Sequence, residues 1–461
     1  MNVEVYNFGP IRKGTVSLKP LTILVGPNGC GKSHIATLIH SIAAAESDRV
    51  TWNPLEADLL QPHTQKALIH NEAGQIIHSH MHGNKSMVYS SIYDTIVNLR
   101  VETFKKILER NFSRNYKELI KTGENLFSLD ISSKTMQNVL EYVGDDLVNS
   151  SYTVHKLKIE FKEYIEMQDN QLNFNAYYKD NELVLDVPKF CDRGFLASAL
   201  NKALKKFYTY PKNIERSIYF PAGRIGLMLA HGPIVSDYYR RISSLDDYSP
   251  RINLQGTNVD FLAMLVEAKD KKGNYADHAS VFEKALEGRI AIVPSLGKSV
   301  SIEFEQHGKK IPLFTAQSSV QDLAALLIYL KHISRQNDLL ILEEPEISLH
   351  PRMQIHLARL IARLINGGLY VLVSTHSPYF MEQLGHCVLA GSSGGSLDSS
   401  KFPIDERLHS SNVAAYGFVR NGDGYDVKQL SVDKNGIDQS EFVDEFSKLY
   451  DELVDLNFEE K

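Results

Sequence analysis

Gly26-Pro27-Asn28-Gly29-Cys30-Gly31-Lys32-Ser33 is the stretch of sequence that decides the fold. It follows an apolar run at 21–25 that predicts a strand, and it precedes a helix predicted over 32–45. A glycine loop between a strand and a helix is the context that a P-loop (Walker A motif) requires. In such a loop the backbone N–H groups bind phosphate, Lys32 reaches the outer phosphates, and the Ser33 hydroxyl binds Mg²⁺. Residues Gly26 to Ser33 are therefore the predicted nucleotide site, and Cys30 contributes its backbone there.

Two further predicted strands end in polar residues. The apolar run 338–342 leads into Glu343 and Glu344, and the run 369–374 leads into His376. Parallel strands present ligand-binding residues at their carboxyl ends. We expect Glu343 near the water shell of Mg²⁺, Glu344 near an attacking water as general base, and His376 near the terminal phosphate. The alternatives are an ordinary charged turn and a structural histidine.

The composition places the chain among soluble globular proteins. It has 461 residues, of which 43% are hydrophobic and 23% charged. Three widely spaced cysteines fit neither a disulfide framework nor a thiolate metal site. No apolar run is long enough to cross a membrane, and the N-terminus does not resemble a signal peptide, so a cytoplasmic protein is expected. The net charge of −6 argues against binding nucleic acid through the whole surface.

The strong patterns lie at the two ends of the chain, which predicts a head formed by residues 1–45 and 216–461. The first strand is expected at 2–8, with turns at Gly9-Pro10 and near Gly14. Apolar blocks at 217–220, 300–304, 338–342 and 369–374 alternate with helices predicted over 320–333 and 353–365, as in a parallel sheet. An acidic amphipathic helix is predicted over 440–456.

Residues 46–215 form an insertion that we expect to be part β lobe and part helical, and to carry oligomerisation or partner contacts. A helix predicted within 92–121 has a basic face, which is either solvated or in contact with nucleic acid or an acidic partner. His78, His80 and His82 alternate at strand spacing, but no carboxylate or cysteine completes a metal site, so a polar strand or loop is favoured.

Together these motifs resemble the ABC-type ATPase heads of the SMC and RecF kind, and most closely the OLD-like AAA ATPases of bacterial antiphage systems. The resemblance implies an α/β P-loop NTPase of the ABC/SMC-head type, with a mostly parallel sheet, an antiparallel β lobe and a long helical insertion. It also implies ATP and Mg²⁺ as cofactors. The residues that carry it are Asn7–Ile11, Leu21–Gly29, Glu343–Pro351, Ser374–Pro378 and 414–456.

The family has a signature motif before a helix, and the corresponding stretch here is Gln317-Ser318-Ser319-Val320-Gln321. On this alignment Ser318 binds the ATP held by the opposite protomer, which implies a homodimer or higher homo-oligomer of ATP-sandwiched heads. Ser319 replaces the usual glycine, which suits a slow ATPase. The candidates for the family's Q-loop glutamine are Gln61 and Gln65.

OLD nucleases carry a metal-binding TOPRIM domain after the ATPase, whereas here Asn421-Gly422-Asp423-Gly424 is not its D-x-D pair. The resemblance therefore implies an ATPase without its own nuclease site, like the stand-alone ATPases of the Septu and PARIS systems. We expect a sensor and scaffold for a separately encoded effector nuclease of the HNH or TOPRIM type. The alternative is a RecF-like or SMC-like DNA clamp, which makes DNA a candidate partner, and a transporter ATPase subunit is a third hypothesis. No membrane partner is expected.

Overall fold

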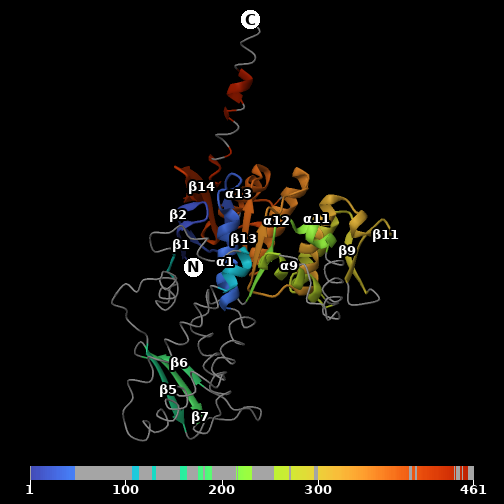
Figure 1. Cartoon of the computed structure of the whole chain (residues 1–461). Coiled ribbons are helices and arrows are strands. Elements are labelled where there is room, and N and C mark those ends of the chain that lie inside the picture. Colours follow the sequence, from blue (N-terminus) through green and yellow to red (C-terminus); the bar gives the residue numbers. More distant parts are fainter. Residues whose placement is uncertain are drawn as a thin grey trace, which may run out of the picture. The chain divides into compact units, whose positions relative to one another are not determined.

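The structure is a computed structural model, and the chain divides into two compact units (Figure 1). One unit holds residues 41–109 and 122–214, and the other holds 2–40, 110–121 and 215–461. The residues that the structure describes are 2–46, 106–113, 127–130, 156–162, 175–179, 182–188, 214, 216–230, 254–268, 271–294, 300–393, 397–399, 402–440, 442, 447–448 and 450–454.

The second unit is built on a large sheet in which the strand order is β1-β2-β15-β14-β3-β13-β12-β8. The five strands from β14 to β8 run parallel, while β1 with β2 and β14 with β15 are antiparallel pairs. The strands are β1 (Asn2–Phe8), β2 (Ile11–Ser17), β3 (Leu21–Val25), β8 (Arg216–Phe220), β12 (Asp338–Glu343), β13 (Tyr370–Thr375), β14 (Val413–Asn421) and β15 (Gly424–Leu430).

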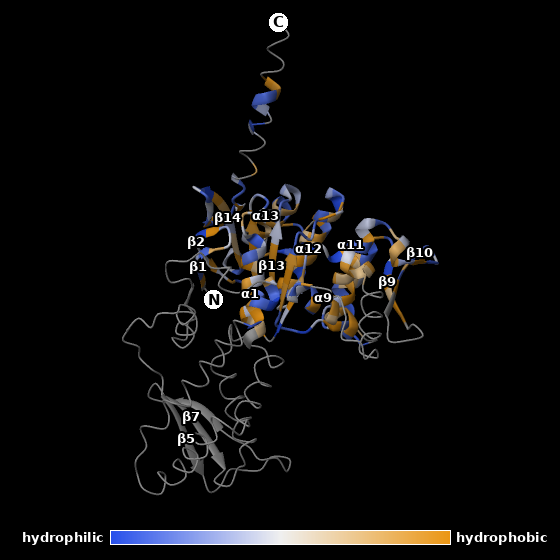
Figure 2. Ribbon diagram, in the orientation of Figure 1, coloured by the Kyte–Doolittle hydropathy of each residue, from blue (hydrophilic) through white to orange (hydrophobic). Residues whose placement is uncertain are grey.

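Helices cover both faces of this sheet. Strands β3 and β12 are buried along their whole length, and Figure 2 shows the central strands as strongly hydrophobic, as expected of strands covered on both faces. Helix α1 contacts the face of β8 that carries Ser217 and Tyr219, whereas Phe220 joins the core on the opposite face. The helices are α1 (Lys32–Glu46), α9 (Gly256–Glu267), α10 (Ala276–Ala285), α11 (Ser318–Ile328), α12 (Pro351–Asn366) and α13 (Pro378–Ser392).

A three-stranded antiparallel sheet in the order β11-β10-β9 lies on the α11 side of the unit (Figure 1). Its strands are β9 (Arg289–Pro294), β10 (Val300–Gln306) and β11 (Lys309–Pro312). Short pieces complete the unit: η1 (Leu313–Thr315), π-helix η2 (Tyr329–Ile333), η4 (Ile404–Glu406), η5 (Ser410–Asn412), β16 (Val432–Asp433) and β17 (Gly436–Ile437).

The other unit contains β4 (Phe127–Asp130) and a small sheet in the order β5-β7-β6. The strands of this small sheet are β5 (Lys156–Lys162), β6 (Asn175–Lys179) and β7 (Glu182–Pro188). These strands lie within residues 46–215, where part of the insertion is expected to be a β lobe.

The sequence predicted the P-loop NTPase fold correctly. The mostly parallel sheet, the antiparallel β lobe and each apolar strand block are confirmed. The helix predicted over 353–365 is α12, which ends at the glycines Gly367 and Gly368, as is typical of a helix C-terminus. The predicted turn near Gly14 is wrong, because Gly14 lies inside β2. A Cβ at Gly14 would lie 2.4 Å from the Val427 side chain, so this glycine permits close approach of two strands. The helix predicted over 320–333 changes from α11 to the π-helix η2 at Tyr329.

Candidate functional site

Four adjacent strands, β3, β13, β12 and β8, end at the same edge of the sheet, and each is followed by polar residues. The glycine loop follows β3 and leads directly into α1. Gly29 and Gly31 have φ of 75° and 111°, a region that side chains rarely adopt, and a Cβ at Gly31 would lie 2.6 Å from Ile11. The loop therefore requires glycine at both positions.

Lys32, at the start of α1, is directed back over the loop. Its Nζ donates to the carbonyl oxygens of Gly26 and Pro27, both at 2.9 Å. The side chain is buried, and burial lowers the pKa of Lys32, which Cys30 and Glu344 oppose. The third hydrogen bond of Lys32 Nζ goes to Cys30 Sγ at 3.8 Å. A buried ammonium held by two carbonyl oxygens and a sulfur is well suited to exchange them for anionic phosphate oxygens.

Glu343 is the last residue of β12 and is 7% exposed. Its Oε2 accepts a hydrogen bond from the backbone N–H of Ala222, at 3.2 Å, in the turn after β8. Burial raises the pKa of Glu343, and the nearby Ser33 and Tyr219 hydroxyls oppose this rise. Its buried Oε1 has no hydrogen-bond partner among the described residues. A carboxylate oxygen without a partner beside the Ser33 hydroxyl is a donor set that fits Mg²⁺.

Glu344 begins the turn after β12 and has a φ of 43°, unusual for a residue with a side chain. Its backbone N–H donates to the Ser374 carbonyl oxygen at 2.9 Å, which fixes the turn against β13. The Glu344 carboxylate is 3.4 Å from His376 Nε2. The interaction with His376 lowers the pKa of Glu344, and Lys32 acts in the same direction, so Glu344 is ionised at neutral pH. The structure thus brings together Lys32, Glu344 and His376.

Glu346 fixes the position of the histidine motif. This buried carboxylate accepts hydrogen bonds from the Thr375 hydroxyl at 2.6 Å and from the His376 backbone N–H at 2.7 Å. It therefore connects the turn after β12 to the end of β13. The sequence placed Glu346 in the family block but assigned it no role.

Arg224 is a second residue that sequence reasoning missed. It follows β8 and is 4% exposed, and its guanidinium donates to the carbonyl oxygens of Glu343 at 2.8 Å and Glu344 at 3.2 Å. Its Nε is 2.7 Å from Asp322 Oδ1, on α11. The sequence shows at this position only a lone arginine after the strand predicted at 217–220, and its partner Asp322 is distant in the sequence.

The other predicted residues have different outcomes. Ser318 is the exposed first residue of α11, and nothing in the described residues tests its role toward a second protomer. Arg110, on the predicted basic face, forms an ion pair with Asp260. The described residues contain no group of three metal-binding side chains and no helix with the length and apolar character that a membrane span needs. Outside the described residues lie Gln61, Gln65, His78, His80, His82, Lys117, Lys121 and Cys191.

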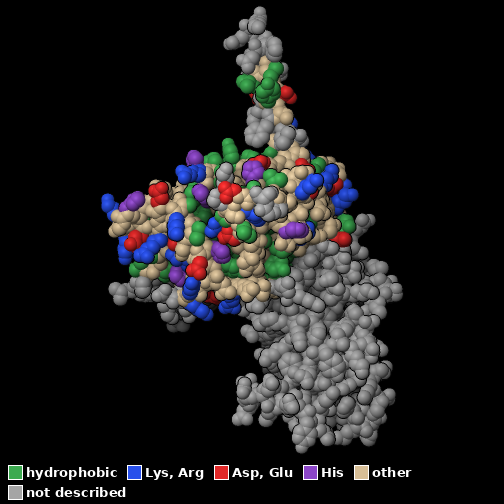
Figure 3. Space-filling model, turned by 180° about the vertical axis from the view of Figure 1, so that it is seen from behind, with side chains coloured by type: hydrophobic (Ala, Val, Ile, Leu, Met, Phe, Trp, Pro, Cys, Tyr) green, Lys and Arg blue, Asp and Glu red, His purple; other side chains and the backbone are tan. Residues whose placement is uncertain are grey.

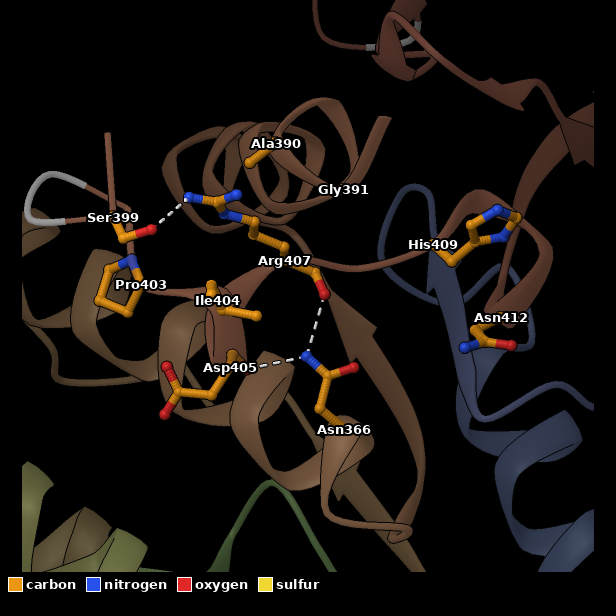
Figure 4. Close-up of a pocket in the computed structure, with 10 residues that line it drawn as sticks. All are labelled: Asn366, Ala390, Gly391, Ser399, Pro403, Ile404, Asp405, Arg407, His409 and Asn412. Carbon is orange, nitrogen blue, oxygen red and sulfur yellow. Dashed lines mark hydrogen bonds between the residues drawn. The ribbon is translucent and has the colours of Figure 1, made fainter. Parts of the chain in front are cut away.

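A hollow of 860 Å³ lies at the opposite edge of the sheet, near the end of α12 and the start of β14 (Figure 4). Its polar groups are bonded to one another: Asn366 donates to the carbonyl oxygens of Asp405 and Arg407, and Arg407 donates to Ser399. The phosphate-binding groups described above are all at the other edge. This hollow is therefore not the nucleotide site.

Comparison with known proteins agrees with this geometry. Residues 1–381 match the sequence family described as AAA ATPase domain. The chain belongs to this family. The match includes the glycine loop, the turn at Glu343 and Glu344 (the acidic turn) and the histidine motif Ser374–Pro378 of this AAA ATPase, and membership implies nucleotide binding. No curated protein matches the chain.

The solved structures similar to this AAA ATPase include SMC head domains. A head bound to the C-winged helix domain of ScpA is 11% identical with a TM-score of 0.38, over 94% of this chain and 98% of that one. The head from Thermotoga maritima is 11% identical with a TM-score of 0.34, over the same shares. A Pyrococcus furiosus head is 10% identical with a TM-score of 0.35, over 98% of each chain.

Proposed function

We propose that the chain hydrolyses ATP at the sheet edge where β3, β12 and β13 end. The observation that carries this proposal is the convergence of Lys32, Glu344 and His376 beside Glu343 and Ser33. Lys32 and the loop N–H groups hold the phosphates. Ser33 and Glu343 would hold Mg²⁺, which would neutralise charge on the transferred phosphoryl group. Glu344 accepts a proton from water, while His376 donates a hydrogen bond toward the terminal phosphate.

The site is completed by a second copy of the chain. Ser318 lies at the N-terminus of an 11-residue helix, where backbone N–H groups favour an anion. In this proposal Ser318 of one protomer contacts the ATP bound by the other, and two ATP molecules hold two heads together. Hydrolysis then separates the heads. Ser319 in place of the usual signature glycine suits a slow ATPase that works as a nucleotide-dependent clamp.

Complementation tests the shared site directly. E344Q and S318R should each be inactive alone, because one lacks the base and the other cannot contact the partner's nucleotide. A mixture should regain activity, since one of the two sites in a mixed dimer combines an intact Glu344 with an intact Ser318. An inactive mixture, with both variants folded and binding ATP, would contradict the shared site. S113R, an exposed serine outside the site, is a matched control that should keep wild-type activity.

The biological role we propose is that of a sensor and scaffold in bacterial antiphage defence, without a nuclease site of its own. The sequence resemblance to OLD-like stand-alone ATPases supports this role. Residues 46–215 would provide oligomerisation and partner contacts, and a separately encoded HNH or TOPRIM nuclease would be the effector. Figure 3 shows positive and negative side chains interspersed over the described part of one face, which does not favour DNA binding there.

The native mass of the assembly, purified with the flanking gene co-expressed, separates the two candidate roles. A complex that contains a second protein and that changes between ATP and ADP would support the scaffold. Exchange between monomer and dimer, with ATPase activity stimulated by DNA and weakened steeply by salt, would instead favour the DNA clamp.

A further inference from the structure

Arg224 joins two elements that the proposed reaction uses. On one side its Nη1 and Nη2 donate to the carbonyl oxygens of Glu343 and Glu344, at 2.8 and 3.2 Å. On the other side its Nε lies 2.7 Å from Asp322, which is 2% exposed. A guanidinium presents its donors in a planar fork, so a shift of Asp322 moves the donors that hold the acidic turn.

Asp322 is one helical turn from the end of α11 that faces a partner in the proposed assembly. It lies four residues after Ser318, which corresponds to about 6 Å along the helix axis. Helices move as rigid elements, so displacement of the first turn of α11 displaces Asp322 as well. The path from Ser318 to the Glu343–Glu344 peptide therefore contains one helical turn and one arginine.

The backbone at the acidic turn is well placed to respond to a shift of Arg224. Glu344 has a φ of 43°. Its carbonyl oxygen accepts a hydrogen bond from Arg224 and its N–H donates one to the Ser374 carbonyl oxygen, so the conformation is held on either side. Residues in sparsely populated conformations persist only where surrounding contacts impose them. A small change in the Arg224 contact is therefore able to reorient the Glu344 carboxylate.

We propose that Arg224 is a positioning residue that couples α11 to the acidic turn, so that contact of Ser318 with a partner's nucleotide aligns Glu344 for hydrolysis. This inference rests on the proposed two-protomer site. It adds to that proposal the route by which occupancy by the partner controls the chemistry.

Strands β8 and β12 provide a matched control. Arg216 on β8 forms an ion pair with Asp338 on β12, at 2.6 Å, at the end of these strands that lies opposite Arg224 and the acidic turn. Asp338 also accepts hydrogen bonds from the Tyr329 hydroxyl and the Arg335 N–H, so it keeps partners when Arg216 is removed. R216M therefore disturbs the same sheet without touching the acidic turn.

The experiment compares R224M, D322N and R216M in the full chain. Binding of a fluorescent ATP analogue should stay within about threefold of wild type in all three, because none contacts the glycine loop. R224M should lower kcat about 100-fold, as expected when a catalytic group is misplaced by about 1 Å, whereas R216M should change kcat less than threefold. R224K should recover less than a tenth of the loss, because an ammonium cannot hold both carbonyls and Asp322.

D322N tests the coupling itself, because it retains the bonds from Arg224 to the turn and removes the charge that pairs Arg224 with α11, while the hydrogen bond from Arg224 Nε to the backbone carbonyl of residue 322, at 3.4 Å, remains. Wild-type turnover per protomer should rise with protein concentration as heads associate, and this rise should be smaller in D322N. If D322N does not fold, R224M/D322L removes both charges, since a buried pair replaced by apolar residues commonly leaves a stable protein. That double variant should fold and still lose hydrolysis.

The outcomes are distinguishable. If R224M/D322L and R216M have kcat within threefold of each other at equal folded fraction, Arg224 has a structural role only and the inference is overturned. A rise with concentration that is as large in D322N as in wild type overturns the coupling but leaves the shared site intact. If wild-type kcat does not rise with concentration and S318R is fully active, the two-protomer proposal fails and the coupling fails with it.

Discussion

Removing the Glu346 carboxylate should loosen the histidine motif, and the structure sets the size of the effect. Its Oε1 accepts from the Thr375 hydroxyl at 2.6 Å and the His376 N–H at 2.7 Å, in a site that is 9% exposed at Glu346. A hydrogen bond to a charged group contributes roughly 1.5–3 kcal/mol. E346A also removes the cost of burying the carboxylate, whose Oε2 has no hydrogen-bond partner among the described residues. This gain offsets part of the free energy that is lost with the two hydrogen bonds. The net cost of E346A is about 2–4 kcal/mol.

E346Q is the matched variant, because its amide oxygen still accepts both hydrogen bonds. Charge-assisted bonds are about twice as strong as neutral ones, so E346Q should lose only about 1–2 kcal/mol. Urea unfolding gives the free energies of unfolding of E346A and E346Q. Hydrogen exchange of the peptide that contains His376 reports how far the histidine motif is loosened. The reasoning would be refuted by two results together: hydrogen exchange at His376 that is as slow in E346A as in wild type, and unfolding free energies of these two proteins that agree within about 0.5 kcal/mol.

The other predictions concern the acidic residues and one cysteine. E344Q should bind ATP but hydrolyse it about 10²–10⁴-fold more slowly in single-turnover assays, and E343A should lose most of the Mg²⁺ dependence of ATP-analogue affinity. The pKa of Glu344 is lowered by His376, so its ionised form stabilises the fold above pH 4.5, the ordinary value, and this contribution is lost as pH falls through the folded-state value. The unfolding free energy of E344Q should therefore depend less on pH in this acid range. Burial raises the pKa of Cys387 to about 12, so alkylation at pH 8, followed by mass spectrometry, should modify Cys387 only after unfolding.

The sequence was most informative where one local pattern dictates one structure. The glycine loop, the apolar strands that end in Glu343 and Thr375, and the terminal glycines of α12 all have the conformations that short-range rules predict. Parallel pairing then places the ends of these strands together, because strands buried on both faces align their carboxyl ends at one edge.

The residues that were missed depend on contacts between distant parts of the chain. Gly14 looks like a turn in the sequence, and its role is visible only once Val427 packs against it. Arg224 and Asp322 are 98 residues apart and carry no local pattern. A buried ion pair is specified by tertiary packing, which periodicity and turn chemistry do not describe.

The left-handed backbone of Glu344 has a consequence for how selection acts on this position. A glycine or asparagine there would relieve a conformation that costs about 1–3 kcal/mol, so the native glutamate is maintained against the demands of folding. The contact with His376 offsets part of this cost, and selection for activity adds to it in keeping glutamate at this position. We expect lineages that have lost ATP turnover but retain the fold to drift toward glycine or asparagine at this position, which makes residue 344 an inheritable record of whether the ATPase is still in use.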